Sequence, residues 1–164
     1  MSIKSGVAVT RDTVRQMMDN IKSLTKQDIL VGIPGEGNTR DDGANNATIG
    51  YLMETGEPAM NLPARPFLVP GVEAGQDKIT DRFEKAANAA IDGRSEEVEK
   101  HLIAAGLQAV SSVKGTIVNG EFEPLSERTL ADRRRRGKKS DKPLIDTSQM
   151  MKSVTYIKRK KGQK

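Results

Sequence analysis

The stretch ETGEPAMNLPARPFLVP, residues 54–70, combines closely spaced prolines with large apolar side chains. Each proline fixes φ and removes an amide donor, so neither a helix nor a central strand suits this stretch. Met60, Phe67 and Leu68 need a surface to pack against, which a flexible linker would not provide. The pattern predicts a stiff, extended arm at residues 57–70.

The arm has two interpretations that the sequence leaves open. It docks on a neighbouring subunit, with Phe67 and Leu68 as its apolar anchor, or it folds back on the protein's own core. A stiff arm loses little conformational entropy when it docks, which favours the first interpretation. Both apply if Pro66 faces inward and Met60 faces outward.

The composition predicts a small core. Hydrophobic residues make up 35% of the 164 residues, and the aromatic residues are three Phe and two Tyr, with no Trp. We therefore expect one domain over residues 1–164 with an interior rich in Ala and Met. Because little apolar surface can be buried within one chain, we also expect the subunit to be completed by its neighbours.

The chain contains no cysteine, which excludes disulfides and thiolate chemistry. No stretch has the apolar length of a membrane span, and the first residues lack the apolar run of a signal peptide. We expect a soluble protein that is used without export.

Apolar residues at three- and four-residue steps predict amphipathic helices. The third helix should begin with Ser95 as its cap and bury a stripe of Val98, Leu102, Ala105, Ala109 and Val113. For the short helix near residue 50, Asn46 is the expected N-cap and Gly56 the stop. Helices are expected at residues 10–24, 47–55, 79–93 and 95–113.

Short β-prone runs predict strands at residues 29–33 and 153–159. The segment TIVNGEFEP, residues 116–124, contains Asn-Gly between two extended pieces and is a hairpin candidate. Ser126 should cap a short helix, and residues 146–153 should form a helical turn. The predicted fold class is α+β, with a small mixed or antiparallel sheet packed against two or three long helices and with extended loops and arms.

The sequence offers no convincing catalytic or cofactor site. GIPGEGNT, residues 32–39, resembles a phosphate-binding loop, but Asn38 stands where lysine is needed, so a surface loop is the better interpretation. His101, the only histidine, is expected to flank the buried stripe of its helix. No carboxylate pair stands out as acid and base. We expect no enzyme activity, no cofactor and no metal.

Charge divides the chain into an acidic body and a basic end. From Ser126 onward there are 14 Lys and Arg against 4 Asp and Glu, a balance of +10; the remaining 13 and 18 give −5, and the two sum to the net +5. Such asymmetry favours an acidic partner. The densest run is RRRRGKKSDK, residues 133–142, which we expect to be a mobile loop.

Three interpretations of this run stay open: a solvated loop, a loop that docks on protein, and direct contact with DNA. Arginine suits phosphate, but no aromatic residue interleaves the run for base stacking. If the run docks on protein, acidic positions on a neighbouring acidic subunit or a second copy of the chain would receive it. Candidate receivers are Glu36, Asp41, Asp42, Glu96, Glu97 and Glu99.

Two stretches together resemble a known family. ATIGYLMETGEPAMNLPARPFLVPGVE, residues 47–73, and PLSERTLADRRRRGKKSDKPLIDTSQMMKSVTYIKR, residues 124–159, are similar to the head–tail joining and tail-completion proteins of tailed phages. The shared features are the PARPFL arm, the PLS motif before a basic loop, and PLIDT before a final strand. The family often has glycine after DT, where this chain has Ser148.

The resemblance implies a structural subunit of the virion neck or tail, made in the host cytoplasm. Such subunits form rings, commonly sixfold, at the head-proximal end of the tail around the DNA path. Connector and tail proteins would be the neighbouring partners. The alternative is a nucleic-acid-binding accessory protein that uses residues 133–142. The implied interface residues are Pro63, Arg65, Pro66, Phe67, Leu68, Arg133, Arg134, Arg135, Arg136, Lys138 and Lys139.

Overall fold

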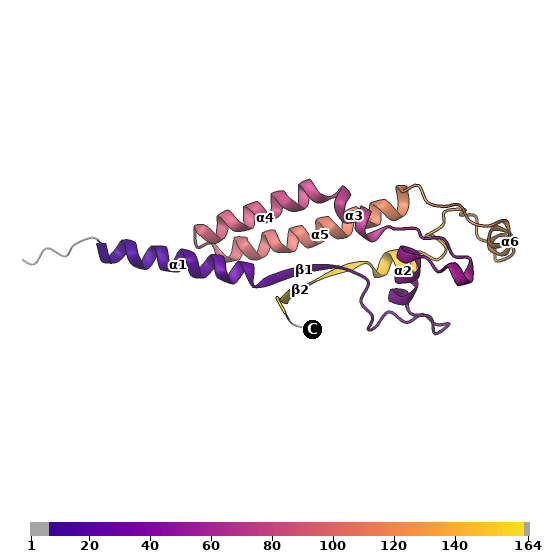
Figure 1. Ribbon diagram of the computed structural model, residues 1–164, viewed down its shortest axis with the longest axis horizontal. Coiled ribbons are helices and arrows are strands. Elements are labelled where there is room, and N and C mark those ends of the chain that lie inside the picture. Colours follow the sequence, from indigo (N-terminus) through magenta and orange to yellow (C-terminus); the bar gives the residue numbers. More distant parts are fainter. Residues whose placement is uncertain (1–6, 163–164) are drawn as a thin grey trace, which may run out of the picture. The chain divides into compact units, whose positions relative to one another are not determined.

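The computed structural model describes residues 7–162 and combines helices with a small sheet (Figure 1). Over these residues it has seven α-helices and a two-stranded antiparallel sheet, and 59% of the chain is helical. The predicted α+β fold class is confirmed. The sheet pairs β1 (Gln27–Gly32) with β2 (Thr155–Lys160), so both predicted strands are present.

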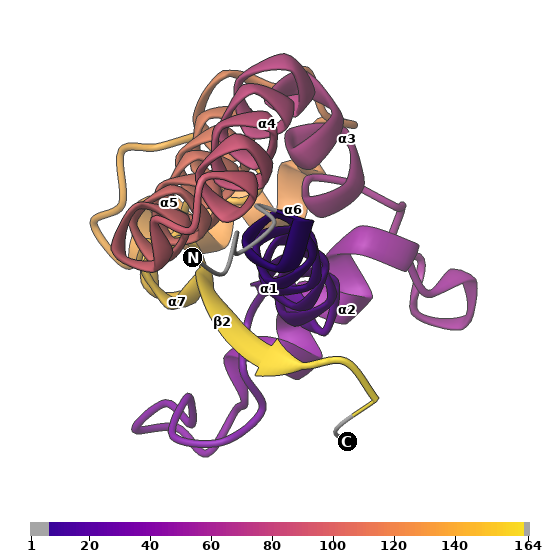
Figure 2. The same cartoon turned by 90° about the vertical axis from the view of Figure 1, so that its left-hand side faces the viewer.

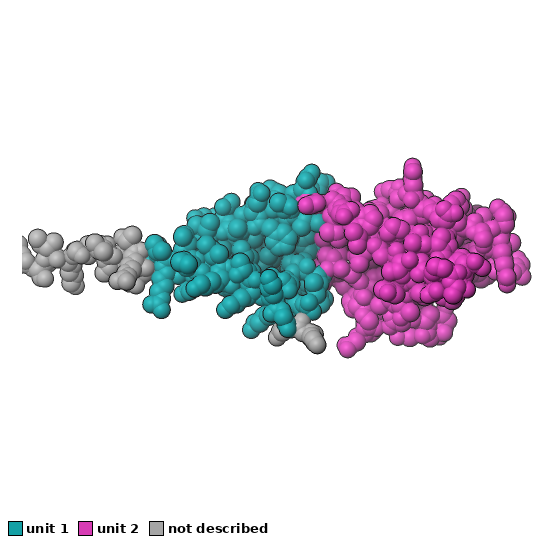
Figure 3. All heavy atoms as spheres, viewed as in Figure 1, with its two compact units in different colours: residues 1–30, 77–106, 157–164 teal, residues 31–76, 107–156 magenta. Residues whose placement is uncertain are grey.

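The chain divides into two compact units, each made of separate segments (Figure 3). Unit 1 contains residues 1–30, 77–106 and 157–164, and unit 2 contains residues 31–76 and 107–156. The boundary therefore falls inside α5 (Ser95–Asn119) and inside both strands. The expectation of a single domain over residues 1–164 stays a prediction.

Unit 1 consists of helices with small buried side chains. It holds α1 (Val7–Thr25), most of α4 (Gln76–Ile91) and the first half of α5, and α4 and α5 run side by side in both views (Figures 1 and 2). Small side chains let two helices approach closely. The buried apolar residues of this unit are Ala86, Ala89, Ala90, Leu102 and Ala105.

Two contacts attach further elements to these helices. The Asn20 side chain on α1 donates to the Ala90 carbonyl on α4 over 3.2 Å. The sheet lengthens by one bond where the Lys161 amide donates to the Lys26 carbonyl over 2.7 Å. Both contacts lie within unit 1 and fix the ends of α1 and β2 there.

Unit 2 holds the largest core cluster. Four short helices belong to it: α2 (Asn46–Thr55), α3 (Leu68–Ala74), α6 (Glu127–Arg135) and α7 (Gln149–Ser153). Close approach to α5 depends on Gly71, where an added Cβ would lie 2.7 Å from the Val113 Cα. The buried members of the core are Phe67, Val113, Ile117, Leu144, Met150 and Val154.

Several predicted features are confirmed. Leu102, Ala105, Ala109 and Val113 of the α5 stripe are buried, and Ser126 caps α6 through a bond from the Thr129 amide. Gly56 ends α2 with a φ of 73°. The helical turn expected at residues 146–153 is α7.

Two predictions of local structure are wrong. The hairpin at residues 116–124 does not form, because the apolar spacing continues to Ile117 and α5 runs to Asn119. The Asn-Gly pair instead ends that helix. The cap of α2 is Asn45, whose side chain accepts from the Ala47 and Thr48 amides, while Asn46 is the first helical residue and is buried.

Candidate assembly site

The proline arm is extended only in its middle. Residues 58–60 form a short 3-10 helix, and α3 takes in the last three positions, including Pro70. No helix is expected here from the sequence, because proline lacks an amide donor. In the first turn of a helix, however, the amides have no helical partners, so a proline there costs no hydrogen bond. Pro70 therefore fits the first turn of α3.

A carboxylate from α2 supplies the missing cap of α3. One Glu54 oxygen accepts from the amides of Phe67 and Leu68 over 2.7 and 2.8 Å, and the other accepts from Val69 over 3.1 Å. Phe67, the N-cap residue of α3, makes no capping hydrogen bond with its own side chain. The negative charge also suits the positive end of a helix. Glu54 thereby fixes the direction in which the arm enters α3.

The two sides of the arm differ in exposure. Phe67 is 2% exposed and lies in the core cluster, while Leu68 is half-buried against it. Met60 and Val69 are 62% and 58% exposed. Phe67 therefore folds back on the protein's own core, which is the second interpretation of the arm. The outward position predicted for Met60 is confirmed. The inward position predicted for Pro66 is wrong, because Pro66 is exposed.

Arg65 is buried within the arm and ties it to the chain before α6. Its Nε donates to the Glu123 carbonyl over 2.8 Å, and an Nη donates to the Pro124 carbonyl over 3.0 Å. Burial lowers the pKa of the Arg65 guanidinium; Glu123 acts against that shift, and the positive charge of Arg133 adds to it. An arginine of lowered pKa remains charged near neutral pH, so Arg65 stays a cation held by carbonyl groups.

Arg133 organises the segment that follows α6. It is 5% exposed, and its guanidinium donates to the carbonyls of four residues at 2.8–3.2 Å. Asp146 balances the charge from 3.9 Å. The four acceptors are Ser140, Lys142, Pro143 and Ile145.

The basic segment, residues 133–142, is only partly the loop that was predicted, and its mobility stays a prediction. Its first three residues belong to α6, and Gly137, with a φ of 72°, ends that helix. The Gly137 amide donates to the Arg134 carbonyl and the Lys138 amide to the Arg133 carbonyl, which is the Schellman pattern. The rest of the segment lies beside the Arg133 side chain, which donates to the carbonyls of Ser140 and Lys142.

The other basic side chains of this segment stay at the surface. Arg134, Arg135, Arg136 and Lys139 are exposed, and Lys138 is half-buried. Arg136 pairs with Asp146 over 3.2 Å, and Arg135 pairs with Asp132. In the arm, Pro63 is exposed as well.

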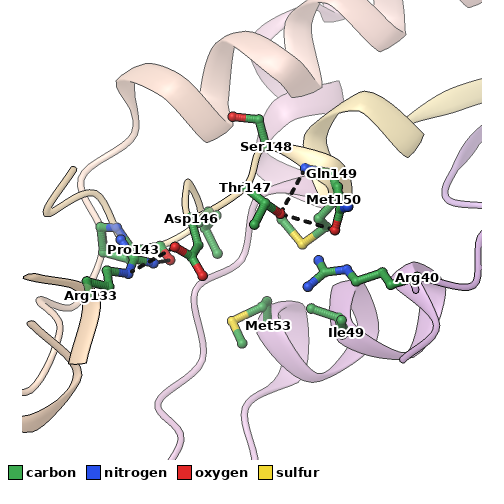
Figure 4. A pocket seen from close by; sticks show the side chains of 11 residues that line it. Arg40, Ile49, Met53, Arg133, Pro143, Asp146, Thr147, Ser148, Gln149 and Met150 are labelled. Atoms are coloured by element: carbon green, nitrogen blue, oxygen red, sulfur yellow. Dashed lines mark hydrogen bonds and ion pairs between the residues drawn. The ribbon is translucent and has the colours of Figure 1, made fainter. Parts of the chain in front are cut away.

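A pocket of about 170 Å³ lies where the two motif-bearing stretches meet (Figure 4). Ile49 and Met53 of α2 form its apolar side, and Thr147 and Gln149 lie opposite. The Arg40 guanidinium points into the space between them (Figure 4). The pocket could receive a single polar side chain.

A polar chain fixes Arg40 in this position. Its Nε donates to the Asn46 side chain over 2.7 Å, and the Asn46 amide group donates to the Ser153 hydroxyl over 3.1 Å. These two hydrogen bonds join the 35–45 loop to α2 and α7. Sequence reasoning missed it, because these contacts span up to 107 positions and follow no local pattern.

Ser148 adopts a backbone conformation that favours glycine. Its φ of 60° and ψ of 6° lie in the left-handed region, directly before α7. Glycine suits this position better, because an L side chain is disfavoured in the left-handed region.

The remaining candidate residues are not gathered into a reactive cluster. His101 is half-buried beside the α5 stripe, and its Nδ1 has no hydrogen-bond partner. Glu97 pairs with Arg94, and Glu99 pairs with Lys158. The 32–39 segment closes on itself where Asn38 donates to the Pro34 carbonyl over 2.8 Å. Within residues 7–162, no group of three or more acidic or histidine side chains could hold a metal ion.

Comparisons with known protein families, curated proteins and solved structures gave no match. None of the helices in the described part of the chain is both long and apolar enough to cross a membrane.

Proposed function

We propose that the chain is a structural subunit of a tailed-phage virion, acting in tail completion or head–tail joining at the head-proximal end of the tail. One observation carries the proposal. The first stretch and residues 124–156 of the second belong to unit 2 and share one core, in which Phe67 from the first packs with Leu144, Met150 and Val154 from the second.

The shared core supports the resemblance because residues of the shared motifs contact one another or the segments beside them. PARPFL supplies Arg65 and Phe67, which tie the arm to the chain before α6 and to the core. PLIDT supplies Leu144 to that core and Asp146 to Arg133.

Large apolar or aromatic side chains of unit 2 are exposed and available to a neighbour. Tyr51, Met60 and Val69 are more than half exposed, although all three are large and apolar or aromatic. Exposed positions of the basic segment, such as Arg134 and Lys139, can add charge complementarity at the rim of an interface. We propose a ring, with six copies as the expected number, and no catalytic role.

The location can be tested directly on virions. Antibody-gold labelling of particles of the phage that encodes this chain should mark the junction of head and tail. Label elsewhere on the particle, or none, would contradict the proposal. Nucleic-acid binding through residues 133–142 is the alternative, but Arg133 is buried, which leaves fewer cations for it.

The assembly surface can be tested with substitutions. Met60→Ser with Val69→Ser should leave helical content and melting temperature nearly unchanged, because both side chains are exposed. The variant should fail to enter particles. Lys85→Ser with Lys152→Ser, also at exposed positions, is the control and should enter normally. Normal entry of the Met60 and Val69 variant would contradict this surface.

A further inference from the structure

A second basic region lies in unit 1, away from the sequence run at 133–142. A pocket of about 720 Å³ is formed where α1 ends and where β1 and β2 pair. Its volume falls in the range of about 300–1,000 Å³ typical of ligand clefts. The residues that line it are Ser23, Lys26, Gln27, Lys158, Arg159 and Lys160.

The charge of this pocket is unbalanced. Four of the described residues that line it are cations, and none is a carboxylate. Lys158 is paired with Glu99, but Lys26 and Lys160 are exposed at the mouth. Positive charges held together by a fixed sheet repel one another, so a bound anion would relieve that repulsion.

A donor in the pocket also lacks a partner. Arg159 is half-buried, and its Nε is shielded from solvent without a hydrogen-bond acceptor among the described residues. A shielded donor without an acceptor destabilises the protein, because its hydrogen bond to water is lost and not replaced. Because the Nε is shielded from solvent, the Arg159 side chain must rotate before it can donate to an oxygen of an anion bound in the pocket.

The side-chain types identify the class of ligand. Lys, Arg, Ser and Gln are residues that contact phosphate and sugar in protein–DNA complexes, where such contacts carry no base specificity. Among the described residues that line the pocket, none is aromatic, to stack single-stranded bases, and none is large and apolar, to anchor a protein. We infer that this pocket binds the phosphate backbone of double-stranded DNA without sequence preference.

This inference goes beyond the proposed assembly role and does not depend on it. It moves the contact with nucleic acid from Arg133–Arg136 to the end of β2. Because binding is measured on the subunit in solution, a failure here leaves the assembly proposal intact.

The test compares two charge reversals of equal size. Lys26→Glu with Lys160→Glu changes the pocket, and Arg134→Glu with Lys139→Glu makes the same change in net charge on the surface of unit 2. Fluorescence anisotropy of a labelled DNA duplex at about 50 mM salt is the readout. We expect the pocket variant to bind at least tenfold more weakly, and its slope of log K against log salt to fall by about 2. The control should change less than threefold.

Three outcomes would overturn the inference. Equal weakening in both variants would mean that only net charge matters. Displacement of the DNA by poly-glutamate at equal charge concentration would indicate an acidic protein partner instead. Saturation by millimolar inorganic phosphate with no preference for DNA would indicate a small-anion site. If circular dichroism shows that the variant Lys26→Glu with Lys160→Glu does not fold, the variant Lys26→Gln with Lys160→Gln is tested instead. Its affinity for DNA should be at least threefold weaker than that of the unchanged protein.

Discussion

At the scale of single residues, burial decides what a charged side chain does. Arg133 and Arg134 are neighbours in one basic run, yet the first is 5% exposed and the second lies at the surface. A buried guanidinium is stable only when its donors are satisfied, and four backbone carbonyls satisfy this one. Arg133 is therefore a structural residue.

Arg133→Ala should destabilise the protein by about 2–4 kcal/mol, because it leaves buried carbonyls without donors and Asp146 without its charge partner. The midpoint of urea unfolding measures the loss. Arg134→Ala is the matched control and should change stability by less than about 0.5 kcal/mol. Similar values for the two variants would contradict the role given to Arg133.

Ser148→Gly should stabilise the protein. The left-handed conformation of an L residue costs about 1–2 kcal/mol, and glycine loses about 0.5–1 kcal/mol more than alanine in backbone entropy. The net gain should lie below about 1 kcal/mol and appear as a higher melting temperature. Ser126→Gly is the control: there φ is −63°, the hydroxyl caps α6, and glycine should lower the melting temperature. A loss at Ser148 as large as at Ser126 would contradict this account.

At the scale of elements, contacts between distant segments set directions that no local pattern encodes. α3 is a seven-residue helix without a capping side chain of its own, and the carboxylate that caps it comes from α2. A helix this short depends on such tertiary contacts, because its propensity alone does not stabilise it.

Glu54→Ala should weaken α3 and loosen the arm, with a loss of about 1–3 kcal/mol, because three amides lose their acceptor. Hydrogen exchange at the amides of Phe67, Leu68 and Val69 should accelerate in step. Glu57→Ala, which removes a single exposed bond to the Ala59 amide, should have little effect. Unchanged exchange at all three amides of α3 would show that the cap is dispensable.

The limits of sequence reasoning follow from the same contacts. The α5 stripe was predictable because Leu102, Ala105 and Val113 repeat at helical spacing. The length of α5 was not, because Asn-Gly occurs both in hairpins and beyond helix ends. The burial of Arg133 left no local trace, since its acceptors are carbonyls, which every residue carries. Gly137 directly after a basic helix end was a usable signal of a Schellman cap.

At the scale of the whole molecule, each compact unit carries a different surface. Unit 2 exposes Met60 and Val69, and unit 1 exposes Lys26 and Lys160 around the basic pocket. Apolar and ionic contacts respond differently to salt, since screening weakens only the second. The acidic and basic halves of the sequence do not coincide with this division, because the basic end contributes residues to both units.

Two variants should therefore affect the two proposed roles independently. Met60→Ser with Val69→Ser should lose particle entry and keep DNA affinity within twofold. Lys26→Glu with Lys160→Glu should lose DNA affinity and keep the ability to form rings, as seen by light scattering and electron microscopy of the purified protein. A variant that loses both properties while its circular dichroism spectrum is unchanged would show that the roles share one surface.

The cap that Glu54 places on α3 also limits how the arm can change in length. The carboxylate and the three amides it binds are separated by 13 to 15 positions, and Gly56, with a φ of 73°, passes so close to Ala64 that an added Cβ would lie 2.7 Å from its nitrogen. Substitutions at exposed positions such as Met60 or Pro63 therefore leave the cap intact, whereas inserting or deleting one residue between Glu54 and Phe67 should displace the amides from the carboxylate. Variation in this arm should be confined to substitution, so that even a surface tag must be placed elsewhere in the chain.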